Sequence, residues 1–283
     1  MTTLPEGFIP KILFILETYS QSFMQGIGYT MLIALVSTFI GCVIGLAVGI
    51  VQTIPTDKTE NAAKHYILMV IKFILNAYVE IFRGTPMMIQ AAFIYYGLPY
   101  VFGINLGMLP AAFLIVSINT GAYMAETVRG GILSIDPGQT EGAMAIGMNH
   151  FQTMTSVILP QALRNIMPQI GNNLIINIKD TSVMSVIGFI EFFGAHNSIV
   201  GLNLLYFPSA VIEMVGYLTL TLIASVILRF VEKRMDGSDH YELVQVDSLT
   251  LTAGTYNHPK RGSNFDERSK EFAGEKSRKK GKG

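Results

Sequence analysis

Polar side chains interrupt a long apolar stretch between residues 161 and 190. Asn173, Asn177 and Asp180 follow the spacing i, i+4, i+7, which places them on one face of a helix. Lys179 lies about 100 degrees away around the same helix. Carboxamides donate and accept hydrogen bonds, so this face could contact a polar solute without covalent chemistry. Alternatively, the asparagines bind neighbouring helices, where polar contacts average about 0.6 kcal/mol, and Lys179 and Asp180 form interhelical pairs.

A second polar stripe with the same spacing lies in an earlier apolar segment: Asn119, Tyr123 and Glu126. This stripe could contact the same polar solute. Glu126 lies three residues before Arg129, however, and residues three apart are neighbours on a helix. A structural ion pair is therefore favoured for Glu126, and the same argument relates Glu80 to Arg83.

The residue types that carry covalent or metal chemistry are absent or isolated. No Ser/His, paired-Asp or His-x-x-x-His arrangement supports an intramembrane enzyme, so no catalytic residue is predicted. Cys42 is the only cysteine and His196 has no companion ligands, so no metal site is expected. The phosphate-binding pattern Gly-x-x-x-x-Gly-Lys-Ser/Thr does not occur. We therefore expect the chain to bind no cofactor and to hydrolyse no ATP itself.

Composition indicates the elements that must position these side chains. Half of the 283 residues are hydrophobic, and 17 of the 40 charged residues lie in the last 48. The zero net charge argues against nucleic acid as a partner. A crossing helix needs about 20 mainly apolar residues, and five segments qualify: roughly Gly26 to Thr53, Ile67 through Val101, Leu109 to Gly130, Gln161 to Ile190, and Ser209 to Val231. The sequence thus predicts an all-α membrane protein with a transmembrane domain over residues 26–235.

Two of these segments have distinctive internal features. Arg83-Gly84-Thr85-Pro86 interrupts the second one, and proline breaks the helical hydrogen-bond ladder. We expect one broken crossing there, with its first half close to the cytoplasmic side. In the first segment, Gly41, Gly45 and Gly49 form a repeated Gly-x-x-x-Gly ridge, which predicts close packing of another helix.

Basic residues indicate the orientation, because short cytoplasmic loops are enriched in Lys and Arg. They fall in alternate connections: Lys58 and Lys64, then Arg129 and Arg164, then Arg229, Lys233 and Arg234. The opposite connections, Pro99 to Met108 and Glu191 to Pro208, contain none. This pattern predicts an N-terminus outside the cell and a C-terminus in the cytoplasm.

Residues outside the crossings are predicted to lie at the membrane surface or in water. Within residues 1–25, apolar side chains recur at helical spacing, which suits an extracytoplasmic helix in the interface. Residues 236–283 are polar and mixed in charge, so we expect a cytoplasmic, disordered tail.

The connection over residues 131–160 is too polar to cross a membrane, yet its helix signals are strong. Asp136 can cap a helix that starts at Pro137, and Gln139 completes a near capping box. The expected helix runs on through Gly147, with Ala143 and Gly147 on one face. Glycine inside a helix costs about 0.5–1 kcal/mol relative to alanine. Close approach by another surface would explain why Gly142 and Gly147 occur in this helix. Packing on this chain's own helices is the alternative.

The order of residues in this loop resembles the signature loop of permease subunits from ATP-binding cassette importers. Glu141-Gly142-Ala143, Gly147 and Ile158-Leu159-Pro160 carry the resemblance, with Gly142 in place of the family's alanine. Further motifs resemble the polar amino acid uptake branch: Asp136-Pro137-Gly138-Gln139, Pro160-Gln161-Ala162-Leu163-Arg164, Tyr78 to Pro86, Tyr123 to Ile132, and Ile178 to Ser182. Their order is consistent from about residue 26 to residue 231.

This resemblance implies a multi-pass protein of a prokaryotic plasma membrane, whose two-fold assembly pairs it with an identical or similar second permease subunit. Its loop would be a cytoplasmic coupling helix that docks on an ATP-binding subunit through Glu141, Gly142, Ala143 and Gly147. That subunit would bind the ATP and Mg²⁺. A separate extracellular solute-binding protein would deliver a polar amino acid.

The path for that solute is expected between the polar stripes described above. Its predicted residues are Asn119, Tyr123, Asn173, Asn177, Lys179 and Asp180. The amides favour an uncharged polar amino acid such as glutamine. An ion-coupled secondary transporter is the alternative function, but five helices without a repeated half fit it poorly.

Overall fold

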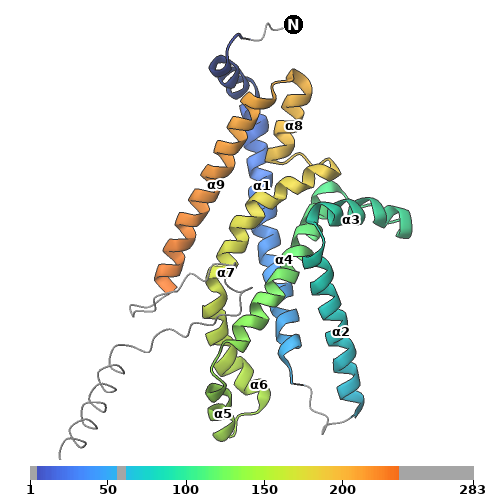
Figure 1. The fold of residues 1–283 in the computed structure, drawn as a ribbon, viewed down its shortest axis with the longest axis vertical. Helices are drawn as coiled ribbons and strands as arrows, with labels where there is room; N and C mark the ends of the chain where they lie inside the picture. The colour runs from blue at the N-terminus through green and yellow to red at the C-terminus, as the bar shows by residue number, and fades with distance from the viewer. Residues whose placement is uncertain (1–4, 56–61, 236–283) are drawn as a thin grey trace, which may run out of the picture. The chain divides into compact units, whose positions relative to one another are not determined.

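The computed structural model describes residues 5–55 and 62–235, and within them the chain forms helices joined by short turns, with no strand (Figure 1). In chain order these are α1 (Phe8–Thr53), α2 (Ala62–Gly84), α3 (Met87–Phe102), α4 (Met108–Leu133), α5 (Pro137–Ala145), α6 (His150–Thr153), η1 (Met154–Ile158), α7 (Leu159–Asp180), η2 (Thr181–Ile187), α8 (Phe192–Asn203) and α9 (Tyr206–Met235). The predicted tail, residues 236–283, lies outside the described residues.

Four described helices are long and apolar enough to cross a membrane, namely α1, α2, α4 and α9. A fifth span is possible where a bent pair, His150–Ile187 and Phe192–Asn203, is taken together across its angle of 47°. The predicted all-α membrane fold with about five crossings is thus confirmed. The fourth crossing was expected to begin near Gln161, but its helix continues back through η1 to His150.

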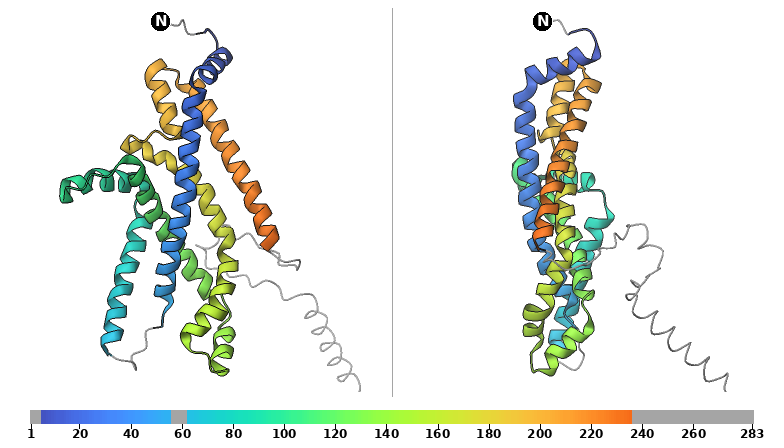
Figure 2. Two further views of the ribbon diagram at one scale, coloured as in Figure 1. Left: turned by 180° about the vertical axis from the view of Figure 1, so that it is seen from behind. Right: turned by 90° about the vertical axis from the view of Figure 1, so that its left-hand side faces the viewer.

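Helix α1 is much longer than a membrane is thick. Its 46 residues extend for about 69 Å at about 1.5 Å per residue, roughly twice the hydrocarbon thickness. Its first turns run at an angle to the remainder (Figure 2), and the location of residues 1–25 in the membrane interface stays a prediction. The helix is continuous from Phe8, so no helix end marks the expected boundary at residue 25.

The core forms where α4 crosses α1. A Cβ added to Gly41 would lie 2.6 Å from Thr120 Cβ, and one added to Gly45 would lie 2.2 Å from Met124 Cβ. These distances are shorter than two carbon atoms can approach, so only glycine allows the two helices to pack this closely. The predicted role of the glycine ridge in packing is confirmed. Helix α4 is accordingly the most buried span, whereas α2 and α9 expose most of their surface.

The chain breaks between α2 and α3, as the Gly84-Thr85-Pro86 sequence predicts. The break leaves carbonyl groups without helical partners, and the side chain of Gln90 compensates. Its Nε2 donates to the carbonyl oxygens of Phe82 and Thr85, both at 2.9 Å.

The prediction of a single broken crossing over both halves was wrong. The 20 residues His65–Gly84 are long enough to cross alone, whereas α3 has only 16 and turns sideways from the bundle (Figure 1).

Candidate functional site

A cavity of about 680 Å³ opens between three parts of the bundle: the α2–α3 junction, the middle of α4, and the end of α7. Helix α4 lies between the other two, because both α2 and α7 pack against it (Figure 1). Five of the six residues predicted for the solute path line this cavity: Asn119, Tyr123, Asn173, Asn177 and Asp180. Lys179, the sixth, is exposed and is not part of the lining. Two separate polar stripes thus meet around one space.

Two of the lining asparagines are occupied by bonds to other helices. The Nδ2 atom of Asn177 donates to Thr38 Oγ1 at 2.7 Å and to Thr120 Oγ1 at 3.0 Å, which links α7 to α1 and α4. Asn119 Nδ2 donates to Gln90 Oε1 at 2.9 Å and supports the helix break. Both side chains are buried. Their polar atoms therefore hold the walls of the cavity together.

Asn173 and Asp180 form fewer hydrogen bonds and ion pairs within the protein. Asn173 Nδ2 donates to the carbonyl of Gln169 in its own helix at 3.0 Å, and its Oδ1 has no hydrogen-bond partner among the described residues. The carboxylate of Asp180 has no ion pair within residues 5–55 and 62–235. These two side chains keep bonding capacity for something in the cavity.

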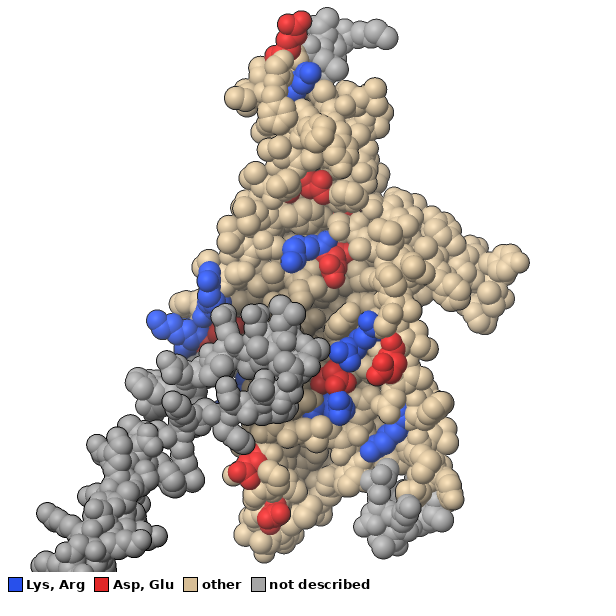
Figure 3. All heavy atoms as spheres, in the orientation of Figure 1, with Lys and Arg blue, Asp and Glu red and all other residues tan. Residues whose placement is uncertain are grey.

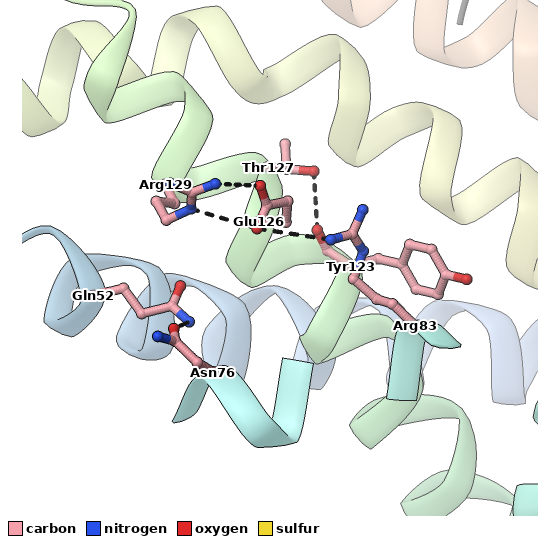
Figure 4. A network of polar contacts seen from close by, with 7 residues as sticks. All are labelled: Gln52, Asn76, Arg83, Tyr123, Glu126, Thr127 and Arg129. Atoms are coloured by element: carbon pink, nitrogen blue, oxygen red, sulfur yellow. Dashed lines mark hydrogen bonds and ion pairs between the residues drawn. The ribbon is translucent and has the colours of Figure 1, made fainter. Parts of the chain in front are cut away.

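A charged cluster lies beside the cavity on α2 and α4 (Figure 4). Glu126 Oε1 accepts from Arg129 Nη2 at 2.5 Å, which confirms the predicted pair. Arg83 does not pair with Glu80 as expected. Its Nη1 lies 3.7 Å from Glu126 Oε2, because the break after Gly84 places the end of α2 against α4. The Arg83 guanidinium also lies 5.8 Å from the centre of the Tyr123 ring and lines the cavity.

The predicted loop helix is present as α5. Asp136 Oδ1 accepts from the Gly138 N–H at 2.7 Å, and the helix starts at Pro137 as expected. The capping box does not form with Gln139. Its Oε1 instead accepts from Gln161 Nε2 at 3.3 Å, which ties α5 to the start of α7.

The predicted common face of Ala143 and Gly147 was wrong, because α5 ends at Ala145. Gly147 has φ +87°, a left-handed conformation that favours glycine. Its N–H donates to Met144 O at 2.9 Å, and the Met148 N–H donates to Ala143 O at 3.1 Å. These two bonds form a Schellman motif that ends the helix. Ala143 is itself buried, so it packs beneath α5 instead of on its outer surface.

The outer surface of α5 contains Glu141 and Gly142, both exposed. Gly142 has a helical backbone, and a Cβ added there would meet no atom within 4 Å. Large apolar side chains follow shortly after in the chain and are also exposed: Ile146 is 80% exposed and Phe151 is 74% exposed. Neither the fold of this chain nor its own packing requires glycine at residue 142.

The sequence reasoning missed a buried polar cluster around Glu191. The stretch from Glu191 to Pro208, expected to be an outer loop, contains α8. Glu191 caps this helix and is fully buried. Its Oε2 accepts from Thr30 Oγ1 at 3.1 Å and from Tyr217 OH at 2.9 Å. His196 is also buried and its Nδ1 lies 2.9 Å from Ser209 Oγ. A carboxylate directly before an apolar run is a helix-start signal that could have revealed α8.

Long apolar helices around a cavity with open polar groups are typical of helical membrane transport proteins. Within that class, residues 62–237 match the family described as "Binding-protein-dependent transport system inner membrane component". The chain belongs to this family.

Individual relatives agree with that assignment. The chain is 37% identical over 213 residues to the glutamine transport system permease protein GlnP of Escherichia coli (strain K12), covering 75% of this chain and 92% of that one. GlnP of Shigella flexneri gives the same values. The predicted membership among permease subunits of ATP-binding cassette importers, in the polar amino acid branch, is confirmed and is favoured over the ion-coupled alternative.

Solved structures share the fold. The chain superposes with a TM-score of 0.69 and 32% identity on a structure titled "Crystal structure of an amino acid ABC transporter with histidines", covering 83% of this chain and all of that one. The MetNI methionine ABC transporter in an inward-facing conformation gives a TM-score of 0.60 at 23% identity, with 77% and 96% coverage. The second comparison supports the fold alone.

Proposed function

We propose that this chain forms the translocation path for a polar, uncharged amino acid, with glutamine favoured, and that α5 couples this path to a separate ATP-binding subunit. The names of the GlnP relatives support the solute class. The cavity supports it as well, because its lining combines open amide and carboxylate oxygens with apolar side chains. Its volume of about 680 Å³ falls in the range of small-molecule sites.

The observation that carries the coupling assignment is the unexplained glycine at residue 142. Exposed Glu141, Gly142 and the neighbouring apolar side chains offer a surface on which another protein can approach the α5 backbone closely. Gly147 and Ala143 support this surface indirectly, by ending α5 and by anchoring it. The partner would bind ATP and Mg²⁺, and its closure would move α5.

Movement of α5 can reach the cavity through rigid contacts. Helix α5 packs against η1, and η1 leads directly into α7, whose far end carries Asn173, Asn177 and Asp180. A second permease subunit, identical or similar, would complete the assembly, and an extracellular solute-binding protein would deliver the amino acid. We assign the N-terminus to the outside and the C-terminus to the cytoplasm, since this places α5 on the side where ATP is available.

A glycine substitution tests the coupling assignment. Gly142→Leu adds a side chain to the α5 surface without a clash inside this chain, so the permease should still fold but fail to dock. We expect ATP-dependent glutamine uptake in proteoliposomes to fall at least about tenfold, together with loss of the ATP-binding subunit on purification. Gly28→Leu is the matched control, because its added side chain also meets open space.

Glu141→Ala sharpens the same test. We expect reduced uptake and reduced transport-coupled ATP hydrolysis, with the permease present in the membrane at normal amounts. Unchanged uptake in both Gly142→Leu and Glu141→Ala, at equal expression, would refute docking through α5.

A further inference from the structure

The cavity wall carries opposite charges on two different helices. Arg83 at the end of α2 and Asp180 at the end of α7 both line it. Helices α2 and α7 are separated by α4, against which each of them packs. Figure 3 shows basic and acidic side chains close together in the middle of one face, with further charged side chains at its left edge and near its two ends. The cavity therefore has a positive and a negative side.

The positive charge of Arg83 is only partly neutralised inside the protein. Arg129 holds the shared carboxylate of Glu126 closely, through Nη2 at 2.5 Å and Nε at 3.4 Å. Arg83 lies 3.7 Å from the same carboxylate, beyond the usual length of a charge-assisted hydrogen bond. Two cations thus share one anion, and the cation with the weaker contact is the one that lines the cavity.

The negative charge of Asp180 also lacks a close partner. Within the part of the chain that the structure describes, no Lys, Arg or His nitrogen lies within 4.0 Å of its carboxylate. Lys179, its neighbour in sequence, acts on this carboxylate electrostatically, but it forms no ion pair with it within 4.0 Å and lies outside the lining. Unpaired charges inside a membrane protein are costly, which marks them as functional candidates.

Asn173 adds an uncharged acceptor to this arrangement. It shares a helix face with Asp180 and lies about 10 Å from it along the helix axis, with its Oδ1 free of partners among the described residues. Asn119 and Asn177 also line the cavity but are committed to other helices. Among the described residues, the open side-chain groups of the lining therefore include one cation, one anion, one amide oxygen and the hydroxyl of Tyr123.

We propose that Arg83 binds the α-carboxylate and Asp180 the α-ammonium group of a zwitterionic amino acid, while Asn173 Oδ1 accepts from its polar side chain. This rests on the proposed function and adds Arg83 as a residue that determines specificity. A solute with only one of the two charges leaves a wall charge unpaired, and sites of this kind strongly reject such analogues. The cavity selects for the zwitterion and not merely for polarity.

Binding to the purified permease–ATPase complex, without the solute-binding protein, tests this directly. The probes are L-glutamine, L-glutaminamide, which lacks the carboxylate, and N-acetyl-L-glutamine, which lacks the ammonium group. We expect the wild type to prefer glutamine to each analogue at least about tenfold, a difference of about 1.4 kcal/mol. Arg83→Gln should abolish the preference over glutaminamide alone, and Asp180→Asn the preference over N-acetylglutamine alone.

Two further variants separate recognition from folding. Arg83→Lys keeps the charge but loses the planar guanidinium, so it should retain more of the preference over glutaminamide than Arg83→Gln does. Arg229→Gln makes the same chemical change as Arg83→Gln on α9, outside the cavity lining, and should bind all three probes normally. Size-exclusion profiles and basal ATP hydrolysis report whether each complex is assembled.

The possible failures are distinguishable. Equal binding of the three probes by the wild type, unchanged preferences in Arg83→Gln and Asp180→Asn, or no binding at millimolar glutamine by a complex that still takes up glutamine would overturn the zwitterion assignment alone. Absence of ATP-dependent uptake of any amino acid in proteoliposomes would instead overturn the proposed function.

Discussion

Two polar regions lie inside the helical bundle, and they differ in how far their hydrogen bonds are satisfied. At Glu191, both carboxylate oxygens accept bonds, from Thr30, from Tyr217 and from two backbone N–H groups at the start of α8. In the cavity, Asp180 and the Oδ1 of Asn173 have no such partners among the described residues. Since an unsatisfied polar group is costly in an apolar surrounding, we interpret the satisfied Glu191 cluster as structural and the open groups that line the cavity as solute-binding.

The largest effect is expected from breaking the satisfied region. Glu191→Ala removes the acceptor of four donors and leaves the buried hydroxyl of Thr30 without this partner. We expect a loss of about 3 kcal/mol or more in the free energy of unfolding, measured by thermal unfolding of the purified protein. Glu191→Gln, which keeps one acceptor oxygen, should lose less. Wild-type stability of the alanine variant would show that the Glu191 cluster does not hold α8 in place.

A smaller loss of stability is expected at Asn177. Asn177→Ala removes the bonds to Thr38 and Thr120, which should cost about 1–2 kcal/mol. Uptake per folded molecule should change little, because these amide atoms are occupied by other helices. A normal unfolding temperature combined with strongly reduced uptake would instead assign Asn177 to the solute.

Asn173→Ala should show the opposite pattern. Among the described residues, the Asn173 side chain forms no hydrogen bond to another helix. The free energy of unfolding should therefore change by less than about 1 kcal/mol. Loss of one neutral hydrogen bond to the solute, worth about 1 kcal/mol, should weaken glutamine binding about fivefold. Parallel calorimetry and binding measurements on Asn173→Ala and Asn177→Ala compare the two asparagines directly, and identical behaviour would break the distinction between them.

The smallest effect is expected at Lys179. This residue was predicted for the path but lies outside the cavity lining. Lys179→Gln should change glutamine affinity by less than about twofold, because its charge acts on the solute only from a distance. A change as large as that in Asp180→Asn would return Lys179 to the solute path.

Local signals in the sequence predicted much of this structure. The capping of α5 by Asp136, the break at Pro86 and the glycine ridge on α1 depend on residues a few positions apart. The helical spacing of Asn173, Asn177 and Asp180 likewise sufficed to bring them to one cavity wall.

The features that the sequence did not predict depend on contacts between residues far apart in the chain. Asn177 bonds to Thr38, 139 residues earlier in the chain, and nothing near either residue reveals that contact. Arg83 lies beside Glu126 only because the α2–α3 break meets α4. The difference between satisfied and open polar groups was therefore beyond what the sequence alone could show.

The central claim is that the cavity beside Asn173 is the solute path, and cysteine modification tests it most directly. Cys42 is the only cysteine, so Cys42→Ser provides a background for Asn173→Cys, with the adjacent exposed residue in Asn172→Cys as control. We predict that a charged, membrane-impermeant thiol reagent blocks uptake through Asn173→Cys and that glutamine protects against it, while Asn172→Cys is unaffected. Continued uptake after complete modification at residue 173, or modification that glutamine does not slow, would contradict the account.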